Sequence, residues 1–190
     1  MNKLFALASI LIIVLASCRP EGGMNADAGY YSITALRDSL IKGKPVYNFQ
    51  KTLVVDGKEE TQLITDSLHL QISFFEHFEI NKPSYKGAYT LEKLLVEDGE
   101  NRGETVVVNE FKRKPEFKYP VTSLTTYTRK HVNKLEVQVV SLEKNLLTNI
   151  TKKLTVFTDS LGFTAYMYSV TEEMQGSEST NTKIILERIP

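Results

Sequence analysis

The sequence predicts an α+β domain in which two short N-terminal helices precede a strongly curved, half-barrel-like antiparallel β-sheet. Two observations lead to this fold class. Near residue 30, apolar side chains recur at intervals of three and four, which is the period of an amphipathic helix. Beyond residue 85, short segments of alternating apolar and polar residues are separated by turn residues, as in an antiparallel sheet with one buried face. We expect about six to eight strands in one layer, and a two-sheet sandwich is the alternative architecture.

Two segments have helical periodicity. The first is Tyr30–Lys42, which Gly43 and Pro45 would end. The second runs from about Ser67 to Glu79, and the side chain of Asp66 can cap its first turn. We expect the second helix to pack on the sheet through one apolar face, made of Leu68, Leu70, Ile72, Phe74, Phe75 and Phe78.

The other segments are expected to be strands. Val46–Val55 and Lys58–Thr65 flank Asp56-Gly57, a dipeptide typical of a two-residue hairpin turn. Clusters of Gly, Asn, Pro or charged residues separate the later strands, which favours short antiparallel connections between neighbours. These strands are Tyr85–Glu97, Glu104–Phe111, Val121–Arg129, Leu135–Glu143, Ile150–Asp159, Thr164–Glu172 and Thr182–Arg188.

The first 18 residues have the parts of an export signal. Lys3 supplies a basic start, and an apolar run of 13 residues from Leu4 to Ala16 follows. A spanning helix needs about 20 apolar residues, so this run is too short for a permanent membrane anchor. Leu15-Ala16-Ser17-Cys18 resembles the lipobox of bacterial lipoproteins, in which small residues precede the cysteine that receives the lipid. We therefore expect residues 1–17 to be removed and Cys18 to become the lipidated first residue of the mature chain.

A tether is expected to join Cys18 to the domain. Residues 18–29 contain almost no bulky apolar side chain, and the 11 residues after the cysteine reach at most about 36 Å. Residues 30–190 then form a single globular domain. Arg19 stands where an inner-membrane retention Asp is familiar, and Glu21 is the only nearby acid, so we expect an outer-membrane position that faces the periplasm.

Composition argues against several kinds of chemistry. The chain has 23 basic and 23 acidic residues, which gives no electrostatic reason to expect binding to nucleic acid or to an anionic membrane surface. Cys18 is the only cysteine, so acylation would leave no thiol for a disulfide, a metal centre or a nucleophile. His69 and His77 are eight residues apart on the second predicted helix, too far to share a metal ion. We assign no cofactor, no metal ligand and no catalytic residue, because nucleotide-binding and nucleophile-elbow motifs do not occur in the sequence either.

Two segments carry a resemblance to a known family. Asp56–Thr61, and Ile80–Tyr89 with its Asn-Lys-Pro followed by Gly-Ala-Tyr, resemble segments of an uncharacterised family of Bacteroidetes lipoproteins. The resemblance covers most of the mature chain. It implies an envelope lipoprotein with a β-rich body, and it adds no catalytic residue.

The tripeptide Asp-Ser-Leu occurs three times, beginning at Asp38, Asp66 and Asp159. It resembles the acceptor site for O-linked glycans on exported Bacteroidetes proteins. Helix capping and turn formation are the alternative explanation. The candidate glycosylation sites, in order of preference, are Ser160, Ser67 and Ser39.

Together these features predict a membrane-anchored envelope lipoprotein whose domain is a non-catalytic binding or accessory module. Its partner would be a protein or a glycan docked on an exposed face or edge strand. The first alternative is a carrier that holds a lipid or another amphiphile in a cavity of about 300 Å³ or more. The second is a hydrolase without a recognisable motif, which would need titratable groups to converge in a cleft.

Overall fold

The computed structural model describes residues 29–42, 47–65, 68–97 and 103–189. The predicted signal, Cys18 and the tether up to residue 28 lie outside the described residues, as do Asp66 and Ser67. The described strands are β1 Asn48–Val55, β2 Lys58–Thr65, β3 Tyr89–Glu97, β4 Thr105–Arg113, β5 Val121–Arg129, β6 Lys134–Lys144, β7 Thr148–Asp159, β8 Gly162–Met174 and β9 Thr180–Ile189.

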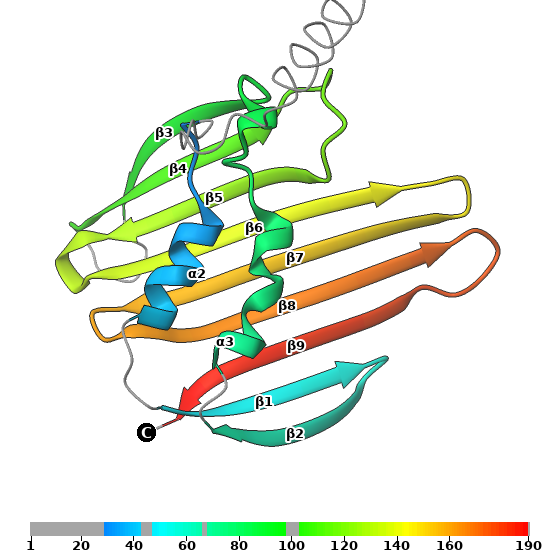
Figure 1. The fold of residues 1–190 in the computed structure, drawn as a ribbon, viewed down its shortest axis with the longest axis horizontal. Coiled ribbons are helices and arrows are strands. Elements are labelled where there is room, and N and C mark those ends of the chain that lie inside the picture. Colours follow the sequence, from blue (N-terminus) through cyan, green and yellow to red (C-terminus); the bar gives the residue numbers. More distant parts are fainter. Residues whose placement is uncertain (1–28, 43–46, 66–67, 98–102, 190) are drawn as a thin grey trace, which may run out of the picture.

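All nine strands belong to one open antiparallel sheet, in the order β2-β1-β9-β8-β7-β6-β5-β4-β3 (Figure 1). The prediction of an α+β fold with a β-rich body is confirmed. The strand count of six to eight was too low, and the described strands do not form the alternative two-sheet sandwich. The additional strands belong to the N-terminal hairpin, because β1 pairs with β9 and so extends the meander beyond its last strand.

The β1–β2 turn follows the prediction made from Asp56-Gly57. Asp56 has a φ of 47° and Gly57 a φ of 83°. Two successive residues with positive φ are what a two-residue hairpin turn needs to match the twist of its strands. The Asp-Gly pair therefore fixes the register of β1 against β2, in which Val55 lies opposite Lys58.

The first helix, α2, spans Ile33–Lys42 and begins three residues later than the sequence pattern suggested. Ser32 lies directly before the helix and caps its first turn, because its Oγ accepts a hydrogen bond from the Ala35 N–H at 3.0 Å. Tyr30 lies before the helix, where its N–H donates to Asn81 Oδ1 at 3.0 Å.

The prediction of one continuous second α-helix, from about Ser67 to Glu79, is wrong. The structure has a four-residue α-turn, α3 (Leu68–Gln71), followed by a 3₁₀ segment, η1 (Ser73–Phe78). Ile72, Phe75 and Phe78 are buried as predicted, and their spacing of three fits the three residues per turn of a 3₁₀ helix. Leu70, expected on the same face, is 62% exposed. Two further 3₁₀ turns are η2 (Pro83–Tyr85), which replaces the start of the predicted strand at Tyr85, and η3 (Lys130–Val132).

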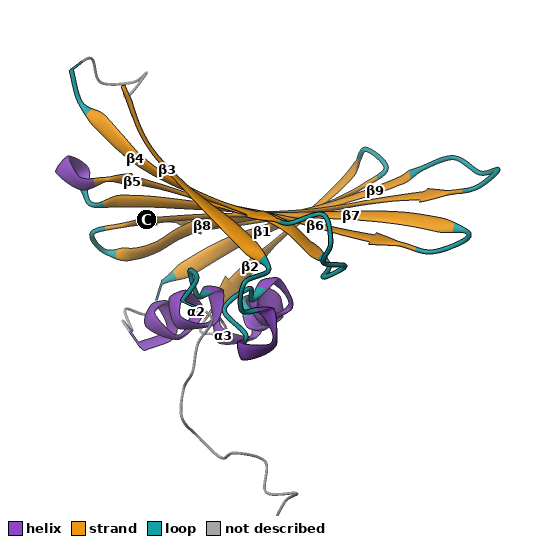
Figure 2. Cartoon of the chain, turned by 90° about the horizontal axis from the view of Figure 1, so that it is seen from above, coloured by secondary structure: helices purple, strands orange, loops and turns teal. Residues whose placement is uncertain are grey.

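The helical segments cover one face of the sheet and leave the other without helices (Figure 2). Aromatic rings fill the described interface. Phe75 and Tyr166 meet edge to face at 5.6 Å, and the Phe74 ring lies 4.8 Å from that of Tyr168. Burial in this layer raises the pKa of Tyr166 to about 12. These interlocked rings form the centre of the core.

A buried carboxylate joins the two helical segments. Glu79, only 7% exposed, follows η1 and faces the first turn of α2. Its oxygens accept hydrogen bonds from the Ser32 hydroxyl at 2.8 Å, the Thr34 N–H at 2.7 Å and the Asn81 N–H at 2.6 Å. Burial and the negative charge of Glu79 raise the pKa of Tyr31 to about 12. The carboxylate thus caps α2 from another segment of the chain, at the end where the helix dipole favours an anion.

Candidate functional site

One row of side chains across the sheet face without helices is largely polar. Core residues such as Leu154 point to the helices, so their strand neighbours point the other way. Strand pairing places one such residue from each strand in a row across this face, and polar side chains dominate the row, which can therefore face water. The row is Glu92, Glu110, Thr125, Gln138, Thr155, Met167, Ile185, Thr52 and Thr61.

A pocket of about 380 Å³ lies where the ends of β5 and β7 meet the starts of β6 and β8. Phe157, Ala165 and Leu135 supply its apolar lining. Phe157 pairs with both Glu136 and Ala165, so three adjacent strands place these three side chains together on the helix-free face. Leu135 belongs to the opposite face and also packs against the core. The pocket is within the size range of small-ligand sites.

Charged side chains surround the apolar part of the pocket. Arg129 and Lys134 are the bases, and Glu136 and Asp159 are the acids. Arg129 Nη1 lies 3.9 Å from Glu136 Oε2, and the Gln138 amide donates to the other Glu136 oxygen at 2.7 Å. The four formal charges cancel, so the pocket favours neither an anion nor a cation.

Asp159 is held in place by its own contacts. One carboxylate oxygen lies 2.8 Å from Arg188 Nη2, and the other accepts the Leu161 N–H at 2.8 Å. Burial alone would raise the pKa of Asp159, but these hydrogen bonds outweigh it and lower the pKa below its ordinary value. Both pocket carboxylates are thus paired with an arginine.

The described Asp-Ser-Leu sites lie in different structural settings. Ser160 is exposed in the β7–β8 turn, next to the anchored Asp159. Ser39 lies within α2, and its hydroxyl donates to the Leu36 carbonyl at 2.7 Å. Ser67 lies outside the described residues. The turn that Asp159 forms also fits the alternative explanation by local turn chemistry.

We expect Ser160 to carry a glycan when the protein is made in a Bacteroidetes host, because an exposed turn presents both the hydroxyl and its backbone. Intact mass compared with protein from the cytoplasm of a glycosylation-free host gives the measurement, and Ser160→Ala should remove the added mass. Identical masses from the two hosts, after allowance for signal and lipid, would show that none of the three sites is glycosylated. Turn formation and helix capping would then explain all three motifs.

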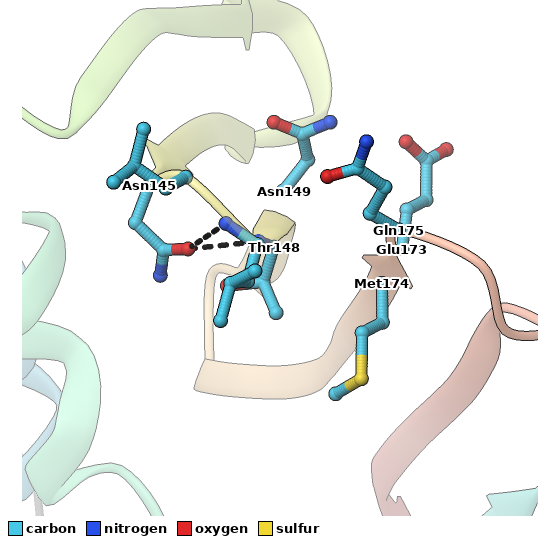
Figure 3. Close-up of a pocket in the computed structure, with 8 residues that line it drawn as sticks. Asn145, Thr148, Asn149, Glu173, Met174 and Gln175 are labelled. Atoms are coloured by element: carbon cyan, nitrogen blue, oxygen red, sulfur yellow. Dashed lines mark hydrogen bonds between the residues drawn. The ribbon is translucent and has the colours of Figure 1, made fainter.

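A smaller hollow of about 270 Å³ lies between the β6–β7 turn and the end of β8 (Figure 3). Asn145 Oδ1 accepts the N–H groups of Leu147 and Thr148, at 2.9 and 2.8 Å. This turn leaves Leu146 95% exposed, and the half-exposed Met174 lines the same hollow. Sequence reasoning missed it, although two leucines directly after Lys144-Asn145 were a usable signal.

Within the described ranges, no group of three His, Cys, Asp or Glu side chains could hold a metal ion. None of the described helices is long and apolar enough to cross a membrane.

The fold and the pocket define a single-sheet α+β domain with a small-ligand-sized surface site. No protein-family model, curated protein or solved structure matches the chain.

Proposed function

We propose that this protein is a lipid-anchored envelope protein whose domain is a non-catalytic binding module. The pocket beside Phe157 carries the proposal, because it combines an apolar floor with paired charges in a space of about 380 Å³. An amphiphilic group fits it best: an apolar part would cover Phe157 and Ala165, and uncharged polar groups would bond to the charged rim. A neutral ligand is favoured since the rim charges cancel.

In this proposal the protein is located at the outer membrane and faces the periplasm, and lipid on Cys18 anchors it there. The support is the lipobox-like Leu15-Ala16-Ser17-Cys18 and the resemblance to Bacteroidetes lipoproteins. Two or more acyl chains bury enough CH₂ groups for stable attachment, so the lipid alone would hold the domain at the membrane.

Cys18→Ala is expected to abolish acylation and to release the protein from membranes, because it removes the thiol that accepts the lipid. Incorporation of radiolabelled palmitate and membrane fractionation give the measurement. A Ser17→Ala variant, which keeps a small residue before the cysteine, is the control and should still be labelled. Label retained by the alanine variant at position 18 would end the lipoprotein proposal.

The carrier alternative would use the sheet as a half-barrel around an amphiphile held beneath the helices. In the described core, the rings of Phe74, Phe75 and Tyr166 contact one another in that space. This packing favours a ligand on the opposite, helix-free face.

Pocket filling tests the binding proposal. In a chain that begins at Arg19 and so lacks the lipidated Cys18, Ala165→Trp should weaken binding of hexyl β-D-glucoside about tenfold or more, because the indole takes the place of the hexyl chain. Met167→Trp is the matched control: it lies two residues along β8 on the same face but does not line the pocket. It should leave the affinity within about twofold.

Titration followed by NMR chemical shifts measures both affinity and location. Shift changes confined to the pocket ends of β5–β8 support the proposal. Equal affinity in the two tryptophan variants, or shift changes centred on α2 and η1, would contradict it.

A further inference from the structure

We infer that one surface of the domain rests on the anionic phospholipid headgroups of the membrane that holds Cys18. We call it the basic aromatic patch, formed by residues 82–88 and 113–120. The inference rests on the proposed lipid anchorage, and it adds a defined orientation of the domain on the bilayer.

The patch is built from two segments that are distant in sequence. Tyr89 at the start of β3 pairs with Arg113 at the end of β4, which brings the preceding and following loops together. The Lys114 N–H donates to the Ala88 carbonyl at 2.9 Å, and the Tyr119 hydroxyl donates to the Ser84 carbonyl at 2.8 Å. Arg113 Nη1 also donates to the Tyr119 carbonyl. These bonds make the two loops one surface.

Stacked aromatic rings form the middle of the patch. The rings of Tyr85 and Tyr119 stack with centroids 3.8 Å apart, and that of Phe117 lies 5.8 Å from Tyr119 at 21°. All three are only partly buried. The Lys82 ammonium lies 5.5 Å from the Tyr85 ring centroid. Partly exposed aromatic rings beside lysines are typical of surfaces at the membrane–water interface.

The charge of the patch is strongly positive although the whole chain is neutral. Its bases are Lys82, Lys86, Arg113, Lys114 and Lys118, and Glu116 is its only acid, so five minus one gives a net charge of +4. Lys82, Lys86 and Lys118 are exposed. The remainder of the chain carries the balancing −4. Such an asymmetry orients a protein on an anionic surface, where each base contributes separately and salt weakens the effect.

The chain enters the domain at this patch. Tyr30, the residue that follows the predicted tether, has its ring 5.4 Å from that of Tyr89, and the Tyr89 ring is 6.4 Å from that of Tyr85. The Tyr30 N–H donates a hydrogen bond to Asn81 Oδ1, and Asn81 directly precedes Lys82 in the chain. Figure 1 shows the start of the α2 segment and the β4–β5 loop along the same upper side. A tether of 11 residues from Cys18 therefore keeps this patch within about 36 Å of the lipid.

The test uses the lipidated full-length mature protein on vesicles. Cys18 is the only cysteine and would be acylated, so an introduced cysteine is the single free thiol for an environment-sensitive NBD label. Ser84→Cys places the label in the patch, and Ser177→Cys places it in the β8–β9 turn. Both serines are exposed, which makes the second a matched control.

On phosphatidylcholine vesicles with 30% phosphatidylglycerol, the label at position 84 should shift to the blue and resist acrylamide quenching, and the label at 177 should do neither. Combining Lys82→Glu, Lys86→Glu and Lys118→Glu should abolish the shift at 84 while the protein still floats with the vesicles. Pure phosphatidylcholine should give less than about half of the shift, because the contact depends on anionic headgroups.

Flotation separates the two proposals. If no variant floats with the vesicles, lipid anchorage fails. If all float but the label at 84 stays quenchable, or shifts equally on neutral vesicles, the orientation inference is overturned. A shift that grows with protein concentration without vesicles would show that a second copy covers the patch, and would also overturn it.

Discussion

Phe75→Ala is expected to lower the free energy of unfolding by about 3–5 kcal/mol, as truncation of a buried phenylalanine does when the surrounding core cannot collapse. The Phe75 side chain is fully buried, and its ring contacts those of Phe74 at 5.2 Å and Tyr166 at 5.6 Å. The 3₁₀ segment that carries Phe75 is only six residues long. Loss of the ring should therefore loosen the packing of η1 against β8.

Urea denaturation measures this effect, and Leu70→Ala provides the control. Leu70 is five residues away and 62% exposed, so its truncation should cost less than about 0.5 kcal/mol. A change below about 1 kcal/mol for Phe75→Ala would mean that the helical layer is not part of the cooperative core.

Glu79→Ala is expected to destabilise the domain by about 3 kcal/mol, because it leaves the Ser32 hydroxyl and the Thr34 and Asn81 N–H groups without their acceptor. The loss should concentrate at the junction of α2 with η1. Hydrogen exchange should then be fastest in the first turn of α2, and urea denaturation gives the size of the effect.

Glu76 supplies the matched comparison. It lies in η1, three residues before Glu79, and its 60% exposed carboxylate pairs with Arg37 at 3.1 Å. Glu76→Ala should cost about 0–1 kcal/mol, as for other exposed ion pairs. Similar effects for the two alanine variants would show that burial of the Glu79 carboxylate is not what holds the junction.

The strands could be predicted from the sequence, because a strand with one buried face has alternating apolar and polar residues. β2 and β5 have the predicted bounds, Lys58–Thr65 and Val121–Arg129, and the other strands differ from their predicted bounds by a few residues at one or both ends. The 3₁₀ geometry of η1 could not be predicted in the same way. Apolar residues at 72, 75 and 78 fit a period of 3.0 as well as one of 3.6, so the pattern does not distinguish a 3₁₀ helix from an α-helix.

The candidate sites were harder to predict because pairing between strands creates them. Phe157 and Glu136 were both placed in predicted strands, but their contact depends on the register of β6 against β7. The same holds for the basic aromatic patch. Lys112-Arg113-Lys114 is only a short basic run in the sequence, and Lys82 joins it only through the pairing of Tyr89 with Arg113.

The pairing of β1 with β9 sets the order in which the domain can fold. Asn48 lies opposite Ile189 and Val55 opposite Thr182, so these contacts close loops of about 130 residues. Contacts of such sequence separation form late and slowly. As the chain is synthesised, the β1–β2 hairpin has no neighbour in the sheet to pair with until the ten residues of β9 are present. A chain that stops before Thr180 would expose unpaired edges on both β1 and β8, and these are templates for aggregation.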